Sequence, residues 1–317
     1  MASERAHPTY LWLNGEIVRW EDATIHISDI GWSTMAAVFE GIKAYWNADE
    51  EQLLGFRFPE HFRRFAHSMK IQRMISRWSA DELQQAAVEL LQANESRQDT
   101  YIRPLTYLAD TAGFGTLLEN PTNILITTFP FTSGLGTRRT VTAGVSSWTR
   151  ISDNVISPRI KCIANYQNSR LAMIEAHQHG YNTAILLNAH GKVTEGAAAC
   201  LFIVRDGVAI TPPVTSGILE SITRDAVLRL CQDTLGIATL ERDVDRTELY
   251  IADEIFLCGT GAEIGAVTAV DGYQIGSGEI GPMTDRVEDL FHAIVRGRDD
   301  RYDHWNLPIQ QVVAVAP

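Results

Sequence analysis

Lysine is scarce in this sequence, since only four of its 317 residues are lysines. Lys161 has the most informative surroundings of the four, because Ile160 and Ile163 flank it between an apolar run and a predicted helix. Partial burial removes water from an ammonium group and lowers its pKa, which favours an amine that forms Schiff bases. A structural lysine that extends its amine to solvent explains the same pattern. The remaining three are Lys43, Lys70 and Lys192.

Excess positive charge and long apolar runs are also missing. The formal net charge is −12 at pH 7, whereas nucleic acids and anionic membranes select basic surfaces. No apolar run reaches the roughly 18 residues of a membrane span, and the N-terminus lacks the apolar stretch of a secretory signal. We therefore expect a cytoplasmic protein with small-molecule partners, and neither a nucleic-acid nor a membrane partner.

Cysteines are few and scattered. The sequence contains no C-x-x-C pair and no histidines clustered at ligand spacing, which argues against a structural zinc site. Free cysteines with apolar neighbours suit a reducing cytosol. We expect no bound metal, and we expect Cys162, which adjoins Lys161, to be a buried filler residue, with a mildly reactive thiol as the alternative. The four cysteines are Cys162, Cys200, Cys231 and Cys258.

Strands and helices are predicted in runs, which is typical of α+β folds. Asn14-Gly15 predicts a two-residue hairpin turn. Pro59 predicts the start of a helix over 60–74, and Ser79 with Glu82 predicts a capping box on a helix that ends near residue 94. Further helices are expected at about 165–179, 221–235 and 282–296. Strands are expected at 10–13, 16–18, 23–27, 41–46, 52–58, 101–108, 123–129, 140–146, 183–188, 192–194, 200–205, 208–211, 237–242, 254–258 and 264–270.

The length of the chain exceeds that of one ordinary core, which favours two domains. The Gly- and Thr-rich stretch 129–138 loses periodicity and is interpreted as the connection. We predict a small N-terminal domain over 1–130, an interdomain loop over 131–138 and a larger domain over 139–317. The second domain is strand-rich, which is a poor match for a doubly wound sheet.

A carbonyl cofactor on Lys161 needs a carboxylate that keeps a pyridine nitrogen protonated. Glu195 stands among small residues that let a flat ring approach, although a turn carboxylate that faces solvent fits too. Tyr166 either hydrogen-bonds a phenolate oxygen or simply packs.

A phosphate on that cofactor needs donors. Ser221 to Asp225 opens a predicted helix, whose N-terminus attracts anions, although an ordinary N-cap fits the same residues. Gly259-Thr260-Gly261 offers a second loop with a hydroxyl, or is a plain turn. Arg57 alternates with aromatic residues, so it either faces solvent or is buried with an anion.

Together these residues resemble, in order, the fold type IV pyridoxal-phosphate aminotransferases, and most of all the bacterial branched-chain amino acid aminotransferases. The resemblance implies an α+β, two-domain fold of the D-amino acid aminotransferase type, with a smaller α/β N-terminal domain and a strand-rich pseudo-barrel C-terminal domain. It runs from the first hairpin to the last helix. The matching segments are 12–15, 38–42, 56–57, 101–105, 146–148, 161–166, 194–196, 222–225 and 259–260.

The resemblance also implies roles for individual residues. Lys161 would form the internal aldimine with pyridoxal 5'-phosphate and shuttle the proton. Glu195 would pair with the pyridine nitrogen and Tyr166 with the ring oxygen. The phosphate would be held by Arg57, Thr223, Thr260 and the backbone of Ile222. The substrate would be contacted by Phe39, Tyr101, Arg103 and the backbone of Gly261 and Ala262.

The implied enzyme is a transaminase that moves the amino group of L-leucine, L-isoleucine or L-valine to 2-oxoglutarate by a ping-pong mechanism. Arg103 supports this reading, because a second carboxylate needs a fixed cation. The resemblance also implies at least a homodimer, with active sites at the interface. Amino acids and 2-oxo acids are the expected small-molecule partners.

Three segments depart from the family pattern. Ala199 and Cys200 replace a polar pair after Glu195, and the segments 31–35 and 131–134 differ where the family shapes its pocket. The last two changes would widen or re-aim the pocket, so an (R)-amine or D-amino acid transaminase, also with dual activity, is the alternative. A lyase of the same fold lacks the combination of 39–41 and 101–103. A non-catalytic scaffold protein is the alternative from a different functional class. It would be colourless, whereas bound pyridoxal phosphate absorbs visible light.

Overall fold

The computed structural model describes residues 7–110 and 115–310, which form two units by their contacts. The first unit contains the described residues up to Thr132, the segment Ile160–Ala164 and the described residues from Ile294 onward. The second contains Ser133–Arg159 and Asn165–Ala293. The sequence placed 160–164 and the last segment with the C-terminal domain, because local periodicity carries no sign of the long-range backbone pairing that joins them to the first unit.

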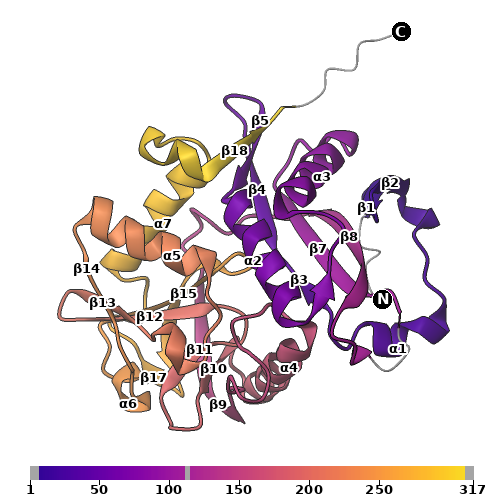
Figure 1. The fold of residues 1–317 in the computed structure, drawn as a ribbon. Helices are drawn as coiled ribbons and strands as arrows, with labels where there is room; N and C mark the ends of the chain where they lie inside the picture. The colour runs from indigo at the N-terminus through magenta and orange to yellow at the C-terminus, as the bar shows by residue number, and fades with distance from the viewer. Residues whose placement is uncertain (1–6, 111–114, 311–317) are drawn as a thin grey trace. The chain divides into compact units, whose positions relative to one another are not determined.

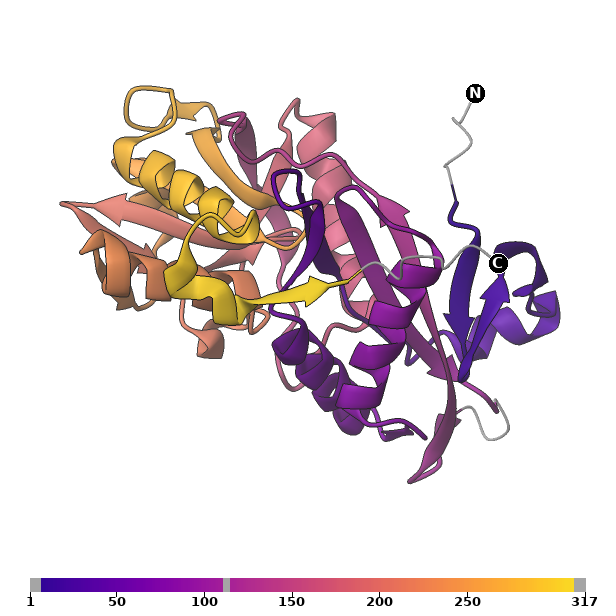
Figure 2. The same cartoon turned by 90° about the horizontal axis from the view of Figure 1, so that it is seen from above.

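The first unit is built on one mixed sheet in the order β18-β5-β4-β7-β8-β1-β2, with β3 beside β7 and β6 beside β8. Figures 1 and 2 show β18 next to β5, although they come from opposite ends of the chain. Helices α2 and α3 pack against each other. The elements are β1 (Tyr10–Leu13), β2 (Glu16–Arg19), α1 (Ile30–Ser33), β3 (Val38–Phe39), β4 (Ile42–Asn47), β5 (Gln52–Phe56), α2 (Phe58–Ile71), β6 (Met74–Ile75), α3 (Ala80–Ala93), β7 (Thr100–Leu108), β8 (Asn120–Pro130) and β18 (Asn306–Ile309).

Local sequence signals explain the hairpin and the helix starts of this unit. Asn14 and Gly15 both have positive φ angles, 50° and 104°, as a tight hairpin turn requires. The capping box of Ser79 and Glu82 is formed at the start of α3. The predicted strand at 23–27 is wrong. Those residues have no partner strand, and 3₁₀ turns at Trp20–Asp22 and Ile27–Asp29 bracket them.

The second unit also has one mixed sheet, in the order β11-β10-β9-β16-β15-β12-β13-β14, with β17 beside β16. β9 runs parallel to β10 and β16, whereas β12 is antiparallel to both β13 and β15. The elements are β9 (Thr140–Thr149), α4 (Ile163–Gln178), β10 (Thr183–Leu187), β11 (Val193–Gly196), β12 (Cys200–Arg205), β13 (Val208–Thr211), α5 (Ile222–Arg229), β14 (Ala238–Glu241), α6 (Arg246–Leu249), β15 (Glu254–Gly259), β16 (Glu263–Val270), β17 (Tyr273–Gln274) and α7 (Pro282–Val295).

Side chains of the second sheet form a buried cluster that includes Leu201, Ile203 and Ile255. The helix predicted over 221–235 is α5 followed by a π-helical turn, Leu230–Leu235, which ends at Gly236 with φ 63°. Gly relieves the steric cost of that left-handed end.

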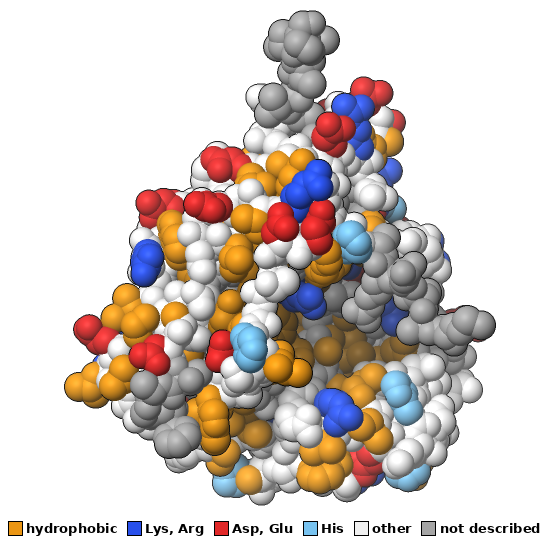
Figure 3. Space-filling view, turned by 90° about the vertical axis from the view of Figure 1, so that its right-hand side faces the viewer, with side chains coloured by type: hydrophobic (Ala, Val, Ile, Leu, Met, Phe, Trp, Pro, Cys, Tyr) orange, Lys and Arg blue, Asp and Glu red, His pale blue; other side chains and the backbone are white. Residues whose placement is uncertain are grey.

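The four cysteines are free and buried, which agrees with the expectation that Cys162 is a buried filler residue. Within the described ranges, no helix is both long and apolar enough to cross a membrane. On the face seen in Figure 3, basic side chains are interspersed with acidic and hydrophobic ones.

Candidate active site

Lys161 belongs to a short extended segment that pairs with β3 in the first unit. The N–H of Phe39 donates to the carbonyl of Lys161 at 2.9 Å, and the N–H of Ile163 donates to the carbonyl of Ala37 at 2.9 Å. The N–H of Lys161 donates to Ser68 Oγ on α2 at 3.3 Å. The backbone of the lysine is therefore held from two sides.

The side chain of Lys161 is half-buried, and its Nζ lies 4.9 Å from the centroid of the Phe39 ring. An ammonium over an aromatic face gains about 0.5–1 kcal/mol at an exposed site and more when desolvated. Of its apolar neighbours, Ile160 is buried, whereas Ile163 is 41% exposed, contrary to the expectation that both shield the lysine. Phe39 is the residue that the structure places against the amine.

Arg57 is the N-cap residue of α2 and has left-handed backbone angles, φ 49° and ψ 42°. This conformation costs a non-glycine residue about 1–3 kcal/mol and is found at functional sites. The guanidinium is buried, lies 5.1 Å from the ring of Trp305, and pairs with Glu60 through Nη2 at 2.8 Å. Arg57 is therefore buried with an acidic partner and oriented at the first turn of a helix.

Tyr101 and Arg103 lie on the same face of β7, since they are two residues apart in a strand. Arg103 is exposed, and its guanidinium carbon lies 4.8 Å from the centroid of Phe129. The hydroxyl of Tyr101 lies against Gly41, where an added Cβ would come within 2.0 Å of it. The strand therefore presents a phenol and a cation side by side.

In the second unit, Glu195 is a buried carboxylate at the end of β11 with fixed partners. Arg150 Nη2 lies 2.8 Å from Glu195 Oε1, and the N–H of Leu219 donates to Oε2 at 3.1 Å. Both side chains of the ion pair are nearly inaccessible to solvent. The solvent-facing alternative for Glu195 is therefore wrong. The sequence pattern did not point to Arg150, because the two partners are 45 positions apart in the chain.

Three of the candidate phosphate residues, Ile222, Thr223 and Thr260, also belong to the second unit. Ser221 caps α5 by accepting a hydrogen bond from the N–H of Arg224, and Ile222 and Thr223 form the buried first turn. Helix α5 packs against β15, which leads into Thr260. A Cβ on Gly259 would lie 3.6 Å from Ala198 O, so the end of β15 lies next to the loop that follows Glu195.

The residues after Thr260 are tied to the interdomain loop. Glu263 is buried with φ 57°, and its carboxylate accepts from Ser133 Oγ at 2.9 Å and from the N–H of Gly134 at 2.7 Å. Gly261 and Ala262 directly precede it. Glu263 was not singled out from the sequence, where it lies directly before the strand predicted over 264–270.

Tyr166 is half-buried in the first turns of α4, next to Asn165, whose amide donates to the carbonyl of Ser157 at 2.9 Å. The segment 31–35 departs from the family pattern. Its residues Gly31 and Trp32 belong to α1, and the side chains of Trp32 and Met35 are exposed.

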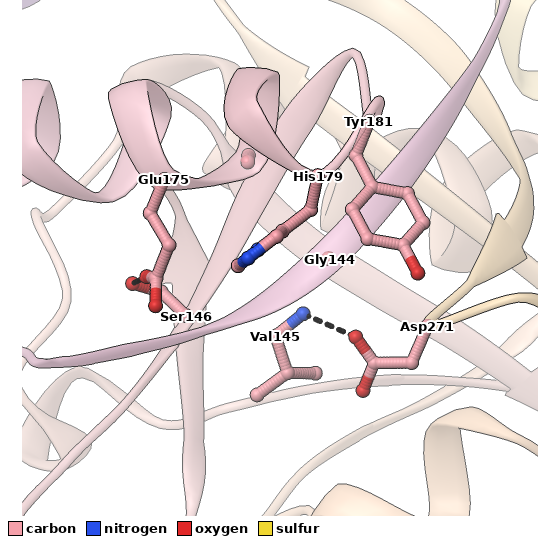
Figure 4. A pocket seen from close by; sticks show the side chains of 8 residues that line it. Gly144, Val145, Ser146, Glu175, His179, Tyr181 and Asp271 are labelled. Carbon is pink, nitrogen blue, oxygen red and sulfur yellow. Dashed lines mark hydrogen bonds between the residues drawn. The ribbon is translucent and has the colours of Figure 1, made fainter.

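A pocket on the second unit has other walls. Figure 4 shows it between β9, the C-terminal end of α4 and Asp271, where the N–H of Val145 donates to Asp271 Oδ1 at 2.7 Å. None of the residues singled out as site candidates lines it. The structure thus gathers the candidates into two sets. The first unit holds Lys161, Phe39, Arg57, Tyr101 and Arg103, and the second holds Glu195, Tyr166, Ile222, Thr223, Thr260, Gly261 and Ala262.

Known proteins match the chain along nearly its whole length. The family model described as amino-transferase class IV matches residues 37–270. A branched-chain-amino-acid aminotransferase of Escherichia coli is 40% identical over 304 residues, which cover 93% of this chain and 95% of that protein.

Solved structures show the same likeness. The PLP-form of a branched-chain amino acid aminotransferase from Thermobaculum terrenum has a TM-score of 0.94 and 46% identity, with 96% of this chain and 99% of that chain covered. A branched-chain aminotransferase from Thermoproteus uzoniensis, solved with norvaline, has a TM-score of 0.89 and 37% identity, with 96% and 100% covered.

These likenesses confirm the predicted α+β fold type IV architecture, with mixed helices and sheets and a curled, strand-rich C-terminal sheet. The expectation of an aminotransferase is confirmed as well, since the family model spans most of the chain. The chain belongs to the class IV aminotransferases and is similar throughout its length to the branched-chain amino acid aminotransferases.

Proposed function

We propose that this enzyme transfers the amino group of L-leucine, L-isoleucine or L-valine to 2-oxoglutarate, with pyridoxal 5'-phosphate as its cofactor. The observation that carries this proposal is the pair Tyr101 and Arg103 on one face of β7. The branched-chain-amino-acid aminotransferase of Escherichia coli, at 40% identity, supports it. The phenol and Phe39 offer apolar surface to a branched side chain, and Arg103 offers a cation to the second carboxylate of glutamate.

The residues present fit the cofactor. Glu195 is buried and oriented by Arg150, as a carboxylate that holds a proton on a pyridine nitrogen requires. The first turn of α5 carries the N–H groups of Ile222 and Thr223 at a helix N-terminus, which favours a phosphate. The Lys161 amine is half-buried against Phe39. When bound, pyridoxal phosphate supplies a carbonyl carbon for attack and a ring that withdraws electrons.

Each residue has a defined task in this proposal. Lys161 would hold the cofactor covalently, and its amine would move a proton from the Cα of the amino acid. Glu195 holds a proton at the ring nitrogen, and Tyr166 donates to the ring oxygen. The substrate α-carboxylate binds the backbone of Gly261 and Ala262. The phosphate ligands are Arg57, Thr223, Thr260 and the backbone N–H of Ile222.

The two substrates bind in turn in this scheme, so the kinetics are ping-pong. The same pocket accepts the amino acid first and the 2-oxo acid second, and Lys161 handles the proton in both directions. We place the reaction in the cytoplasm, which the four free, buried thiols support.

We also propose a homodimer. The described surface around α1 exposes large apolar side chains, among them Ile27 at 80% and Trp32 at 54%. Exposed apolar groups that gather in one segment favour a protein interface.

A half-reaction spectrum tests the proposed activity. The purified holoenzyme is mixed separately with L-leucine, L-glutamate, D-alanine and (R)-1-phenylethylamine, and the visible band of the bound cofactor is followed. We expect the band to be lost rapidly with L-leucine and L-glutamate and slowly with the other two. Rapid loss with D-alanine or the amine alone would instead show that the altered segments 31–35 and 131–134 have redirected the pocket.

A further inference from the structure

A largely buried ion cluster lies in the first unit, next to Phe39 in the sequence. Glu40 is completely inaccessible to solvent, and Arg64 holds it with two hydrogen bonds, Nε to Oε1 at 2.7 Å and Nη2 to Oε2 at 2.8 Å. His61 Nδ1 lies 2.9 Å from Oε2. An ionised carboxylate can only accept, so both basic residues donate to it. We call these three residues the Glu40 cluster.

The Glu40 cluster is charged and well satisfied. Burial raises the pKa of Glu40, but the charge of Arg64 and the hydrogen bonds from His61 and Arg64 outweigh it and bring the pKa to about 2. Burial lowers the pKa of His61 below its usual value, and the charges of Arg64 and Lys161 lower it further, although the hydrogen bond and charge of Glu40 act in the opposite direction. The positive charge of Lys161 therefore acts on His61, one member of the cluster.

Glu40 stands between two residues that lie against candidate site residues, Phe39 and Gly41. Phe39 precedes it and lies against the Lys161 amine, 4.9 Å from Nζ to the ring centroid. Gly41 follows it and lies against the Tyr101 hydroxyl, where no Cβ fits. The N–H of Gly41 also lies 3.2 Å from Glu40 Oε2, so the carboxylate fixes this peptide directly.

Helix α2 carries the other side of this arrangement. His61, Arg64 and Ser68 follow Arg57 at spacings of four, three and four residues, which places all four on one helix face. Arg57 is the proposed phosphate ligand at the start of that face, and Ser68 accepts from the backbone of Lys161 near its end. One rigid helix thus links the phosphate ligand, the Glu40 cluster and the lysine.

We propose that Glu40, His61 and Arg64 are positioning residues, which hold Phe39 against the Lys161 amine and Gly41 against the Tyr101 hydroxyl. The inference rests on the proposed function, since it assigns the cluster to the site built on Lys161. The cluster does not touch reacting atoms. It sets the geometry in which Lys161 receives a proton, and a misplacement of about 1 Å can cost about 100-fold in rate.

The test compares holoenzymes of four proteins. Glu40→Gln keeps the shape of the side chain but removes its charge, and Arg64→Lys keeps the cation but loses the two-pronged geometry. Asp99→Asn is the matched control, because it breaks another well-shielded arginine pair of the first unit, with Arg296, that touches neither Phe39 nor Gly41. The wild type is the reference.

Three quantities are measured on each protein: the single-turnover rate with L-leucine, the visible circular dichroism of the bound cofactor, and the melting temperature. For Glu40→Gln we expect a rate at least about tenfold lower and a weakened dichroic band. For Arg64→Lys we expect a rate about threefold lower with the band largely retained. Asp99→Asn should lower the melting temperature and leave the rate and the band unchanged.

The inference is overturned if Glu40→Gln and Arg64→Lys match Asp99→Asn in rate and in dichroism. If Glu40→Gln does not fold, Arg64→Lys decides, and a rate and band equal to the wild type overturn the inference. Failure of the proposed function is distinguishable, because the wild type itself would then show no visible band or no reaction with L-leucine.

Discussion

Single residues decide the chemistry of this protein through partners that lie far away in the chain. The carboxylate of Glu195 is oriented by Arg150 and by the N–H of Leu219, so its two oxygens are both occupied on the protein side. Arg150 is itself fixed, because its Nε donates to the carbonyl of Gly217 at 3.1 Å. A chain of contacts thus supports one carboxylate.

We expect Arg150→Met to weaken the enzyme strongly. Glu195 would then stay buried without its guanidinium partner, and breaking such a pair costs about 3–5 kcal/mol of stability. The dissociation constant for pyridoxal phosphate, measured by equilibrium dialysis, should rise at least about tenfold. The control Arg242→Met breaks the ion pair with Glu248 on the same unit and should leave that constant unchanged. Equal constants for both variants would remove Arg150 from the site.

At the scale of elements, one side chain of the second unit joins two short connections. The loop at 133–134 is anchored by the Glu263 carboxylate, and Glu263 opens β16 directly after the 260–262 loop. Two segments that the sequence associated with substrate are therefore joined by one side chain. The left-handed backbone of Glu263 stores strain that these hydrogen bonds offset.

We expect Glu263→Gln to alter substrate binding more than turnover. The amide keeps one acceptor for the N–H of Gly134, but its NH2 group must donate to Ser133 Oγ and the negative charge is lost, so the two loop contacts weaken by about 1 kcal/mol. The KM for L-leucine should rise about fivefold while kcat stays within about twofold of the wild type. Steady-state kinetics at saturating 2-oxoglutarate measures both. A fall in kcat with an unchanged KM would contradict the loop's role in binding.

At the scale of the molecule, surface composition bears on assembly. Apolar side chains are exposed along residues 25–35 of the first unit, in a segment with few regular elements of its own. In a monomer these side chains would stay in water. Burying a large apolar side chain fully is favourable by about 1.5–3 kcal/mol of free energy, which an interface could supply. A second copy of the chain is the cover that we propose.

We expect Trp32→Glu to weaken the dimer. A charge in an apolar interface is costly to desolvate, so the sedimentation coefficient should fall toward that of a monomer at micromolar concentration. Ile251→Glu serves as the control, since Ile251 is exposed at 62% on the second unit, outside that segment. Identical sedimentation of Trp32→Glu and the wild type would exclude residue 32 from the interface.

The sequence by itself determined the local structure and the family. The hairpin at Asn14-Gly15 and the capping box at Ser79 are formed as predicted, because their chemistry is complete within a few residues. The order of short motifs around Lys161 and Glu195 was enough to indicate a class IV aminotransferase, which the family model confirms.

Only the tertiary structure decided which residues support the site. The pairing of Lys161 with Phe39, the ion pair of Arg150 with Glu195 and the enclosure of Glu40 all join positions that are far apart in the chain. The apolar alternation at 23–27 predicted a strand but found no partner, since a strand needs a neighbour that the local sequence does not specify. Local pattern fixes a residue's own conformation, whereas burial and ion pairing depend on what folding brings next to it.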